Sequence, residues 1–468
     1  MVQDPELTFI DLPAQVVRVL RALGDAGHEA ALVGGVVRDR VRGVPLRDSD
    51  DWDAATSARP EEVAALFGDA TWENRFGTVT IRGRPTVEVT SYRTEGGYRD
   101  RRRPDEVRFG ASLADDLARR DFTINALAWI PTDLAAGRGR IVDPFDGAAD
   151  LHAGLLRTVG EPRERFDEDA LRLVRAARFA GRLGLVIDPE TEAAIRELAP
   201  TVATVSAERL RDELLRMLDD AVPSTALRHL ERWGLLGLIL PELAALRGVP
   251  QAKLVPGDAL DHVLASVDAA PPGDVPLRLA ALLHDIGKAT TLADGHFIGH
   301  DRVGAELASE ALHRLRVPSS DSVPAVNAIR HHMYAYDDSW TDAAVRRFIR
   351  RVGEPDIALL FALRRADDAA SGVGSAGVER QPELERRIAA ELERSPDLLI
   401  RNRLAIDGND LQRELGWEPG PRIGRVLDRL MEAVLDDPSL NRREILLGLA
   451  RDTEAKAVTE RTGAEPDG

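Results

Sequence analysis

The strongest constraint on the fold is a change of hydrophobic pattern near residue 150. Before it, β-branched runs at 30–33, 78–82 and 86–90 lie between glycines and prolines, as is typical of strands in a mixed α/β unit. After it, strand patterns nearly vanish and apolar residues recur at helical spacing, as in 210–218. The pattern predicts a multidomain α+β protein with a small mixed α/β head followed by mostly α-helical regions.

Length and composition exclude several classes of protein. The chain has 468 residues, which at roughly 150 per domain suggests about three units. No apolar run approaches the roughly 18 to 20 residues that span a bilayer, so we expect no membrane segment. The start of the chain is acidic, unlike a secretory signal, which favours a cytoplasmic protein. The absence of cysteine excludes disulfides, thiolate metal sites and cysteine nucleophiles.

The charge balance limits how the chain can meet a nucleic acid. There are 62 basic and 79 acidic residues, a net charge of −17, so the overall field does not attract a polyanion. A polyanion must instead meet local arginine clusters. Two such clusters are Arg99, Arg101, Arg102 and Arg103, and Arg172, Arg175, Arg178 and Arg182.

A glycine pair between a strand and a helix is a candidate phosphate site. Gly34 and Gly35 end the predicted strand, and a helix is expected at 36–42 with Arg38 on its first turn. Glycines let a phosphate approach the backbone, and a helix N-terminus offers free N–H groups. The pattern predicts a seat for a triphosphate, although such a pair alone is more often just a tight turn.

An acidic segment at 48–56 follows the glycine pair. Carboxylates two residues apart in a strand project from one face and can bind divalent metal, as two Mg²⁺ ions do in nucleotidyl transfer. Taken alone, the segment could be a solvated acidic turn. The order along the chain favours nucleotide chemistry, because Glu88 follows on a later strand as a candidate third carboxylate.

Six segments in order carry a family resemblance. They are 32–39 (LVGGVVRD), 51–60 (DWDAATSARP), 88–93 (EVTSYR), 119–126 (RRDFTINA), 143–151 (DPFDGAADL) and 168–179 (EDALRLVRAARF). Together they resemble the motifs of class II CCA-adding tRNA nucleotidyltransferases, of the polymerase-β-like superfamily, over about residues 13–240. The resemblance implies template-independent addition of CCA to the 3′ end of tRNA from CTP and ATP, with two Mg²⁺ ions and release of pyrophosphate.

The position of the catalytic carboxylates departs from the family spacing. Counting forward from Arg38 selects Asp48 and Asp50, whereas counting back from Thr56 selects Asp51 and Asp53. We choose Asp51 and Asp53 as catalytic and metal-binding residues. This register turns the intervening apolar side chains toward the core, whereas the other would bury polar ones.

A second set of residues is predicted to bind the nucleotide. We expect one helix over 168–182, with Asp169, Arg172 and Arg175 on a single face, although a surface helix braced by ion pairs would show the same pattern. An adjacent carboxylate and guanidinium can read base edges. The resemblance implies that Asp169 and Arg172 bind the base, with support from Arg120, Asp121, Asn125, Arg175 and Arg178.

A Gly- and Arg-rich stretch at 95–104 has no periodicity and is predicted to be a mobile loop. Most such loops are merely solvated. In the resembling family, a loop at this place helps the switch from C to A addition. Its presence therefore favours synthesis of the full CCA end.

The later part of the chain groups its histidines with aspartates. His262, His284, Asp285 and Asp367 resemble the pattern of HD-domain phosphohydrolases, whereas a lone histidine is usually a structural residue. Such a set predicts a divalent metal, compatible with manganese, nickel or magnesium, that activates water for phosphate ester hydrolysis. Further candidate ligands are His300, His331 and His332.

The domain organisation and the rival functions complete the expectation. Bacterial poly(A) polymerases share the head motifs but rank second here, because no strongly basic extension ends the chain; a metal-dependent phosphohydrolase is the other alternative. The expected partners are tRNA, CTP and ATP, with no protein partner inferred. The predicted parts are a nucleotidyltransferase head (13–150), a helical neck (151–245), an HD domain (250–375), a helical tail (376–452) and a frayed end (453–468).

Overall fold

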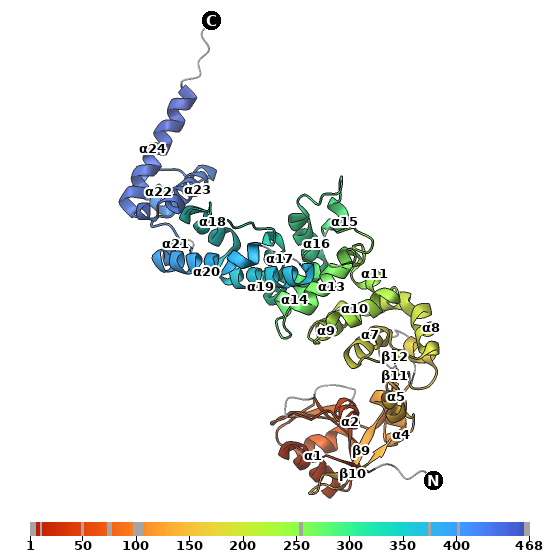
Figure 1. Cartoon of the computed structure of the whole chain (residues 1–468). Coiled ribbons are helices and arrows are strands. Elements are labelled where there is room, and N and C mark those ends of the chain that lie inside the picture. Colours follow the sequence, from red (N-terminus) through yellow and green to blue (C-terminus); the bar gives the residue numbers. More distant parts are fainter. Residues whose placement is uncertain are drawn as a thin grey trace. The chain divides into compact units, whose positions relative to one another are not determined.

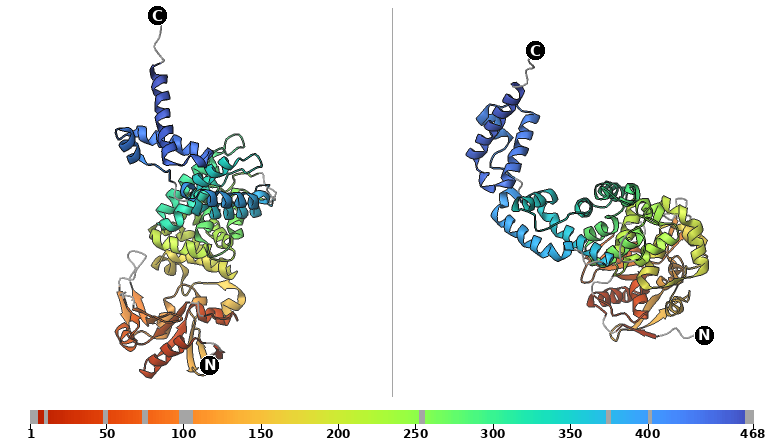
Figure 2. Two further views of the ribbon diagram at one scale, coloured as in Figure 1. Left: turned by 90° about the vertical axis from the view of Figure 1, so that its left-hand side faces the viewer. Right: turned by 45° about the horizontal axis from the view of Figure 1, so that its top comes forward.

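The computed structural model divides into two compact units, residues 1–244 and 245–468, which we treat separately. Most strands lie in the red-to-orange part of the chain, and the regular elements that follow are helical apart from the short strands β11 (Leu155–Leu156) and β12 (Val186–Ile187) (Figure 1, Figure 2). This confirms the expected multidomain α+β class. The structure describes residues 6–9, 12–47, 51–72, 77–96, 106–251, 256–372, 376–399 and 403–462.

A mixed sheet forms the head, in the order β1-β10-β9-β2-β3-β6-β5-β4. Neighbouring strands are antiparallel except for β3 and β6, which run parallel. A separate antiparallel ribbon joins β7 (Arg93–Gly96) to β8 (Glu106–Phe109). The sheet strands are β1 (Glu6–Thr8), β2 (Ala30–Val33), β3 (Trp52–Thr56), β4 (Ala70–Thr71), β5 (Thr78–Ile81), β6 (Val87–Ser91), β9 (Ala128–Asp133) and β10 (Arg138–Val142).

The two faces of the sheet have different roles. Trp52 and Ala54 of β3 lie in a core that also holds apolar residues of α1 (Ala14–Asp25), α2 (Gly35–Val41) and α3 (Pro60–Leu66). Because side chains alternate along a strand, Asp53 projects from the opposite face. The core thereby fixes the side of the sheet on which carboxylates are presented.

Helices follow the sheet within the first unit. α7 (Leu171–Leu183) packs against α9 (Ala207–Leu218) and α10 (Pro223–Arg232). The approach to α10 is close, because a Cβ added at Gly181 would lie 2.6 Å from the backbone nitrogen of Ala226. The other elements are α4 (Leu113–Ala118), α5 (Gly147–Ala153), α6 (Pro162–Glu168), α8 (Pro189–Leu198), α11 (Leu236–Ile239), α12 (Pro241–Ala244) and the short strands β11 (Leu155–Leu156) and β12 (Val186–Ile187).

The single helix expected over 168–182 is wrong. α6 ends at Glu168 and α7 begins at Leu171, with Asp169 extended at φ −152° and ψ 104°. The Asp169 carboxylate accepts a hydrogen bond from the backbone N–H of Leu171 at 3.1 Å. Aspartate side chains that bond nearby backbone groups compete with helical hydrogen bonds, which explains the break.

The second unit is helical throughout its regular elements. α18 and α19 share one apolar core with the helices that follow, including Phe348 and Phe361 on one side and Leu384 and Leu430 on the other. The end expected to fray from residue 453 is helical as far as Thr462, in a stretch rich in helix-forming residues. The helices are α13 (Ala259–Ala269), α14 (Val275–Leu283), α15 (Lys288–Thr291), α16 (His300–Arg314), α17 (Ser319–His331), α18 (Asp342–Val352), α19 (Glu354–Ser371), α20 (Ala376–Arg394), α21 (Pro396–Leu399), α22 (Gly408–Leu415), α23 (Pro421–Asp436) and α24 (Arg443–Thr462).

Among the helices in the described ranges, none combines the length and the apolar character that crossing a membrane requires.

The contact between α7 and α10 gives a stability prediction. Gly181→Ala should lower the free energy of unfolding of the first unit by about 1–3 kcal/mol, because the new methyl group meets backbone atoms that cannot move aside easily. Urea unfolding followed by circular dichroism measures the change. Gly237→Ala is the control, since the nearest atom to its added Cβ is 3.9 Å away. Equal stability of the two variants would contradict the prediction.

Candidate functional site

Three segments of the first unit converge on Gly34, at the end of β2. Its backbone has φ 71°, a conformation that favours glycine. A Cβ added there would lie 3.3 Å from Nη1 of Arg120 and 3.6 Å from Oδ2 of Asp53. Gly34 therefore lets the guanidinium group of Arg120 and the carboxylate of Asp53 approach the turn that leads into α2.

The parallel pairing of β3 with β6 places Asp53 directly opposite Glu88. Trp52 and Ala54, on either side of Asp53, are 2% and 1% exposed, while Asp51 is exposed at the start of the strand. This packing is the one expected for the register chosen above, in which Asp51 and Asp53 are the paired carboxylates and Trp52 and Ala54 face the core. Asp48 and Asp50, the alternative pair, lie outside the described residues, so the assignment of the catalytic carboxylates stays a prediction.

The electrostatics of Asp53 suit a cation site. Burial is the largest cause that raises the pKa of its carboxyl; Arg120 lowers this pKa, Glu88 and Asp51 raise it, and the net value is about 6. Carboxylates that repel one another in a partly buried place are stabilised by a bound divalent cation. The oxygen ligands here fit Mg²⁺, which prefers them.

A buried carboxylate links the predicted nucleotide-binding residues. Asp121 accepts hydrogen bonds from Nδ2 of Asn125 at 3.0 Å and Nε of Arg175 at 2.8 Å. Burial alone would raise the pKa of Asp121, but Arg175, Asn125 and Arg172 hold it at about 2. Arg38 joins the same network by donating from Nη1 to Oδ1 of Asn125 at 2.9 Å.

Arginines of α7 form the other side of this network. Glu213 of α9 accepts hydrogen bonds from Arg175 at 3.2 Å and from Arg178 at 2.6 Å. The ring of Phe179 lies beneath Arg38, Arg175 and Arg178, with ring-to-guanidinium distances of 5.5, 5.2 and 4.3 Å. The structure thus gathers arginines from two distant segments around one aromatic ring.

The predicted base-reading pair has partners inside the protein. Asp169 accepts two hydrogen bonds from Arg209, at 3.0 and 2.6 Å. Arg172 is 9% exposed; it donates to the carboxylate of Glu168 and, at 3.1 Å, to the carbonyl oxygen of Arg119. In the structure, the side chains of Asp169 and Arg172 therefore already form hydrogen bonds with other residues of the protein.

Sequence reasoning missed Arg209, Glu213 and Phe179. Arg209 and Glu213 lie on an amphipathic helix whose leucine spacing drew attention to the apolar residues only. One signal was available, since arginines three residues apart at 175 and 178 require a counter-charge when buried. Nothing in the sequence indicated which helix would supply it.

The second unit brings the histidines and aspartates together. Nε2 of His262 lies 3.3 Å from Nε2 of His284 and 2.9 Å from Oδ1 of Asp367. Asp285 lies within the same cluster, with Oδ2 at 3.7 Å from Nε2 of His262. His300 and His332 also face Asp285, but His331 belongs to neither group of potential metal ligands found among the described residues.

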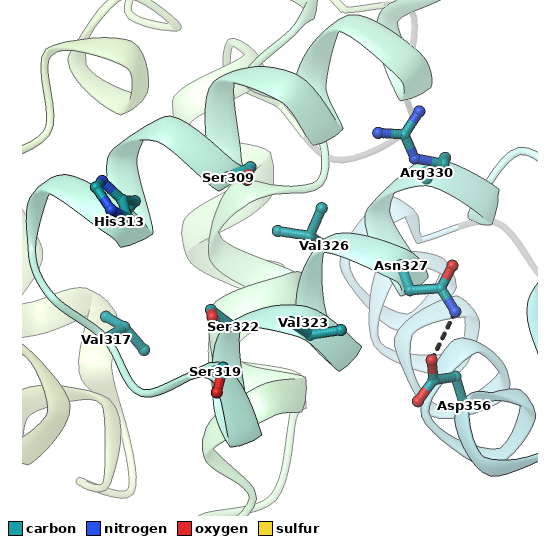
Figure 3. A pocket seen from close by; sticks show the side chains of 10 residues that line it. All are labelled: Ser309, His313, Val317, Ser319, Ser322, Val323, Val326, Asn327, Arg330 and Asp356. Atoms are coloured by element: carbon teal, nitrogen blue, oxygen red, sulfur yellow. Dashed lines mark hydrogen bonds between the residues drawn. The ribbon is translucent and has the colours of Figure 1, made fainter.

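A pocket beside α16 and α17 lies apart from these ligands (Figure 3). It is lined by side chains such as His313 and Arg330, and Nδ2 of Asn327 donates a hydrogen bond to Asp356 at 2.6 Å. None of its ten lining residues is a candidate residue of either site. We assign it no role.

Comparisons with known proteins agree with this geometry. Residues 30–157 match the family "Poly A polymerase head domain", 184–246 match "Probable RNA and SrmB- binding site of polymerase A", 273–372 match "HD domain" and 378–450 match tRNA nucleotidyltransferase domain 2. The chain is 35% identical to the CCA-adding enzyme of Limosilactobacillus reuteri, over 92% of this chain and 94% of that protein. The chain belongs to the class II CCA-adding tRNA nucleotidyltransferase family.

Two further relatives refine the comparison. The chain is 37% identical to the A-adding tRNA nucleotidyltransferase of Deinococcus radiodurans, over 86% of this chain and 91% of that protein. The solved structure of the CCA-adding enzyme of Bacillus stearothermophilus, in complex with CTP, superposes with a TM-score of 0.67 at 28% identity. That match covers 95% of this chain and 98% of the solved one. Within the tRNA nucleotidyltransferase family, the set of nucleotides added therefore differs between relatives.

The raised pKa of Asp53 predicts a stability that depends on pH. The folded value of about 6 exceeds the ordinary 3.8, so the contribution of Asp53 is most favourable below the ordinary value and is lost as pH rises through about 6. Asp53→Asn has no such loss. In the presence of a chelator, raising the pH from about 4.5 to about 7.5 should therefore lower the free energy of unfolding of the parent relative to that of the variant, as measured by urea unfolding. A stability difference that does not change with pH would contradict this.

The ion pair between Arg209 and Asp169 predicts an effect on nucleotide choice. Arg209→Gln should release the Asp169 carboxylate and change the ratio of kcat/KM for correct and incorrect nucleotides by about tenfold or more. Arg211→Gln is the matched control on the same helix, because Arg211 pairs with exposed Asp212. Equal losses with all four nucleoside triphosphates would show that Arg209 supports the fold only.

Proposed function

We propose that this chain adds CCA to the 3′ end of tRNA, using CTP and ATP and releasing pyrophosphate. One observation supports this most: Asp53, which pairs in register with Glu88, meets Arg120 at the Gly34 turn in a chain that aligns with CCA-adding relatives over nearly their whole length. In this reaction the 3′ hydroxyl of the RNA attacks the α-phosphorus of the nucleotide. The bond to pyrophosphate breaks as the new phosphodiester forms.

The head residues have distinct proposed roles. Asp51 and Asp53, with Glu88 beside them, would hold two Mg²⁺ ions, which neutralise phosphate charge and acidify the attacking hydroxyl. Gly34 and Gly35 leave room for the triphosphate at the turn. Arg38 is already held in place by Asn125, so its guanidinium is available there without further ordering.

The base is proposed to be read by side chains. Asp169 and Arg172 offer acceptors and donors of the kind that recognise base edges. Arg120, Asp121 and Asn125 lie on the sheet side of the network, and Arg175 and Arg178 on the helix side. A cytosine or adenine bound there would replace the internal hydrogen-bond partners of Asp169 and Arg172.

The extent of addition is the finer question. Relatives at similar identity carry the names CCA-adding and A-adding. The loop at 95–104 favours complete CCA synthesis. Its residues 97–104 lie outside the part of the chain that the structure describes. The assignment of full CCA addition therefore rests on the family and on the sequence of that loop.

A tRNA extension assay tests the proposal. The purified chain should convert tRNA lacking its last three nucleotides into tRNA ending in CCA when given labelled CTP and ATP. Asp51→Ala should reduce both incorporations by about 10²-fold or more, because it removes a cation ligand from the developing charge. Asp133→Asn, at a partly exposed position of the same sheet, is the control and should retain activity.

The other outcomes of this assay are informative. Extension only of tRNA that lacks the final A would identify an A-adding enzyme, and long adenylate products would identify a poly(A) polymerase. No extension of any RNA by folded protein would overturn the transferase assignment.

A second function is favoured by the histidine cluster. Nε2 of His262 lies 3.3 Å from His284, 3.7 Å from Asp285 and 2.9 Å from Asp367, so these four side chains converge closely enough to share one divalent metal. We propose that this HD centre holds a divalent metal and hydrolyses phosphate esters. Two further predictions stand beside these proposals. One is the division into head, neck, HD domain and tail given above, and the other is a cytoplasmic location.

A further inference from the structure

We propose that Phe179 is a positioning residue for nucleotide addition, whose ring holds the guanidinium group of Arg38 against α7 beside the triphosphate seat. This role rests on the proposed CCA addition and deepens it, because Phe179 belongs neither to the proposed metal ligands nor to the proposed nucleotide contacts. An apolar side chain thus has a defined task at the centre of a charged network.

Phe179 shares one face of α7 with two arginines. It follows Arg175 by four residues and Arg178 by one, and residues four apart lie on the same side of a helix. The guanidinium carbons lie 4.3 Å from the ring centre for Arg178, 5.2 Å for Arg175 and 5.5 Å for Arg38. All three are within the range of about 6 Å in which the face of an aromatic ring attracts a cation.

Arg38 reaches α7 by two routes. Along the first, Nη1 of Arg38 donates to Oδ1 of Asn125 at 2.9 Å, and Nδ2 of Asn125 donates to Oδ1 of Asp121 at 3.0 Å. Asp121 in turn accepts from Nε of Arg175 at 2.8 Å. The ring of Phe179 gives the second route, which is direct. A change of this ring therefore acts on Arg38 without removing any of these hydrogen bonds.

The three guanidinium groups carry like charges in a buried place. Burial lowers the pKa of Arg178, Glu213 opposes this shift, and Arg175 lowers the pKa further. Glu213 pairs with both of these arginines, and Asp39 pairs with Arg38 at 2.8 Å. The negative face of an aromatic ring adds attraction for a cation without adding a charge. A further carboxylate in its place would compete with a triphosphate for Arg38.

The ring contact also leaves donors of Arg38 available. Nε and Nη2 bond the carboxylate of Asp39 at 2.8 and 3.0 Å, and Nη1 bonds Asn125. Each Nη atom carries a second N–H, for which the described part of the chain supplies no acceptor. Nη2 lies 3.7 Å from the position of a Cβ added at Gly35, so these donors are beside the glycine turn. A triphosphate would meet them already in place.

Phe122 fixes the orientation of the Phe179 ring. The two rings meet at 75° with centroids 5.8 Å apart, which is a preferred edge-to-face arrangement. Phe122 is fully buried, and its backbone N–H donates to the carboxylate of Asp121 at 2.9 Å. The ring that holds Arg38 is therefore itself held by the residue that follows Asp121.

Fluorinated phenylalanines at position 179 test the role of the ring face. Fluorine withdraws electron density from the face and changes the shape of the ring little, so each added fluorine weakens its attraction for a guanidinium group. In the full chain, kcat/KM for CTP and for ATP should fall stepwise from phenylalanine to 4-fluoro- and 3,4,5-trifluorophenylalanine, by about threefold or more in total. The KM for tRNA should stay within about twofold of the parent value.

Phe179→Leu removes the ring and keeps an apolar side chain. It should lower kcat/KM for both nucleotides by about tenfold. Phe166→Leu is the matched control and should keep the parent value, because Phe166 is fully buried in the same unit and no guanidinium group of the described residues lies over its ring. Equal losses in the two leucine variants, or rates that do not respond to fluorine, would overturn the role of Phe179.

Arg38→Gln identifies the group on which the ring acts. In that background, Phe179→Leu should have almost no further effect on kcat/KM, because the guanidinium group that the ring positions is already gone. A tenfold loss of about the same size in both backgrounds would overturn the link between Phe179 and Arg38.

Equilibrium binding of CTP in the presence of Mg²⁺, without RNA, separates this proposal from the proposed CCA addition. A parent that binds CTP but extends no tRNA would overturn CCA addition alone, and the fluorine series would then be measured in the dissociation constant for CTP. A parent that extends tRNA normally, with kcat/KM unchanged by every substitution at position 179, would overturn the role of Phe179 alone. A parent that neither binds CTP nor extends tRNA would overturn both.

Discussion

The candidate nucleotide site of the first unit is organised around one buried carboxylate, that of Asp121. It receives Asn125 from its own turn and Arg175 from a helix that follows much later in the chain. Through Asn125 the connection continues to Arg38 beside the glycine turn. Removing one member of such a network leaves others buried without a partner, so these residues stabilise the fold and position the site together.

This network also explains how an acidic protein can bind a polyanionic substrate. The net charge of −17 gives no general attraction for RNA or nucleotides. Arginines near the site are instead held at fixed positions by buried carboxylates: Glu213 pairs with Arg175 and Arg178, and Asp121 pairs with Arg175. Local positive charge is thereby kept in a defined geometry within a chain whose net charge is negative.

The sequence predicted the features that depend on local pattern. Strand alternation identified Trp52 and Ala54 as core residues. The grouping of His262, His284, Asp285 and Asp367, which resembles the HD pattern, indicated a metal centre. The break at Asp169 was not predictable from periodicity, because a side-chain bond to the backbone ended the helix.

Partners from distant segments were equally hidden from the sequence. Arg209 and Glu213 reach their partners only through the packing of α9 against α7, and no local pattern specifies which faces of two helices meet. The same holds for His331 and His332, since two adjacent histidines look alike in the sequence. Only the direction of the last turn of α17 separates a buried ring from a half-exposed one.

One helix of the second unit belongs to two environments at once. α19 bears Asp367 near its end, while Leu360 and Phe361 on the same helix lie in the apolar core built with the tail helices. A chain cut after residue 375 would keep every candidate ligand of the HD centre but would expose the apolar side chains of Leu360 and Phe361. The part of the chain that bears the His/Asp cluster is thus no detachable module, and the geometry of that cluster is thermodynamically tied to the last hundred or so residues through shared burial.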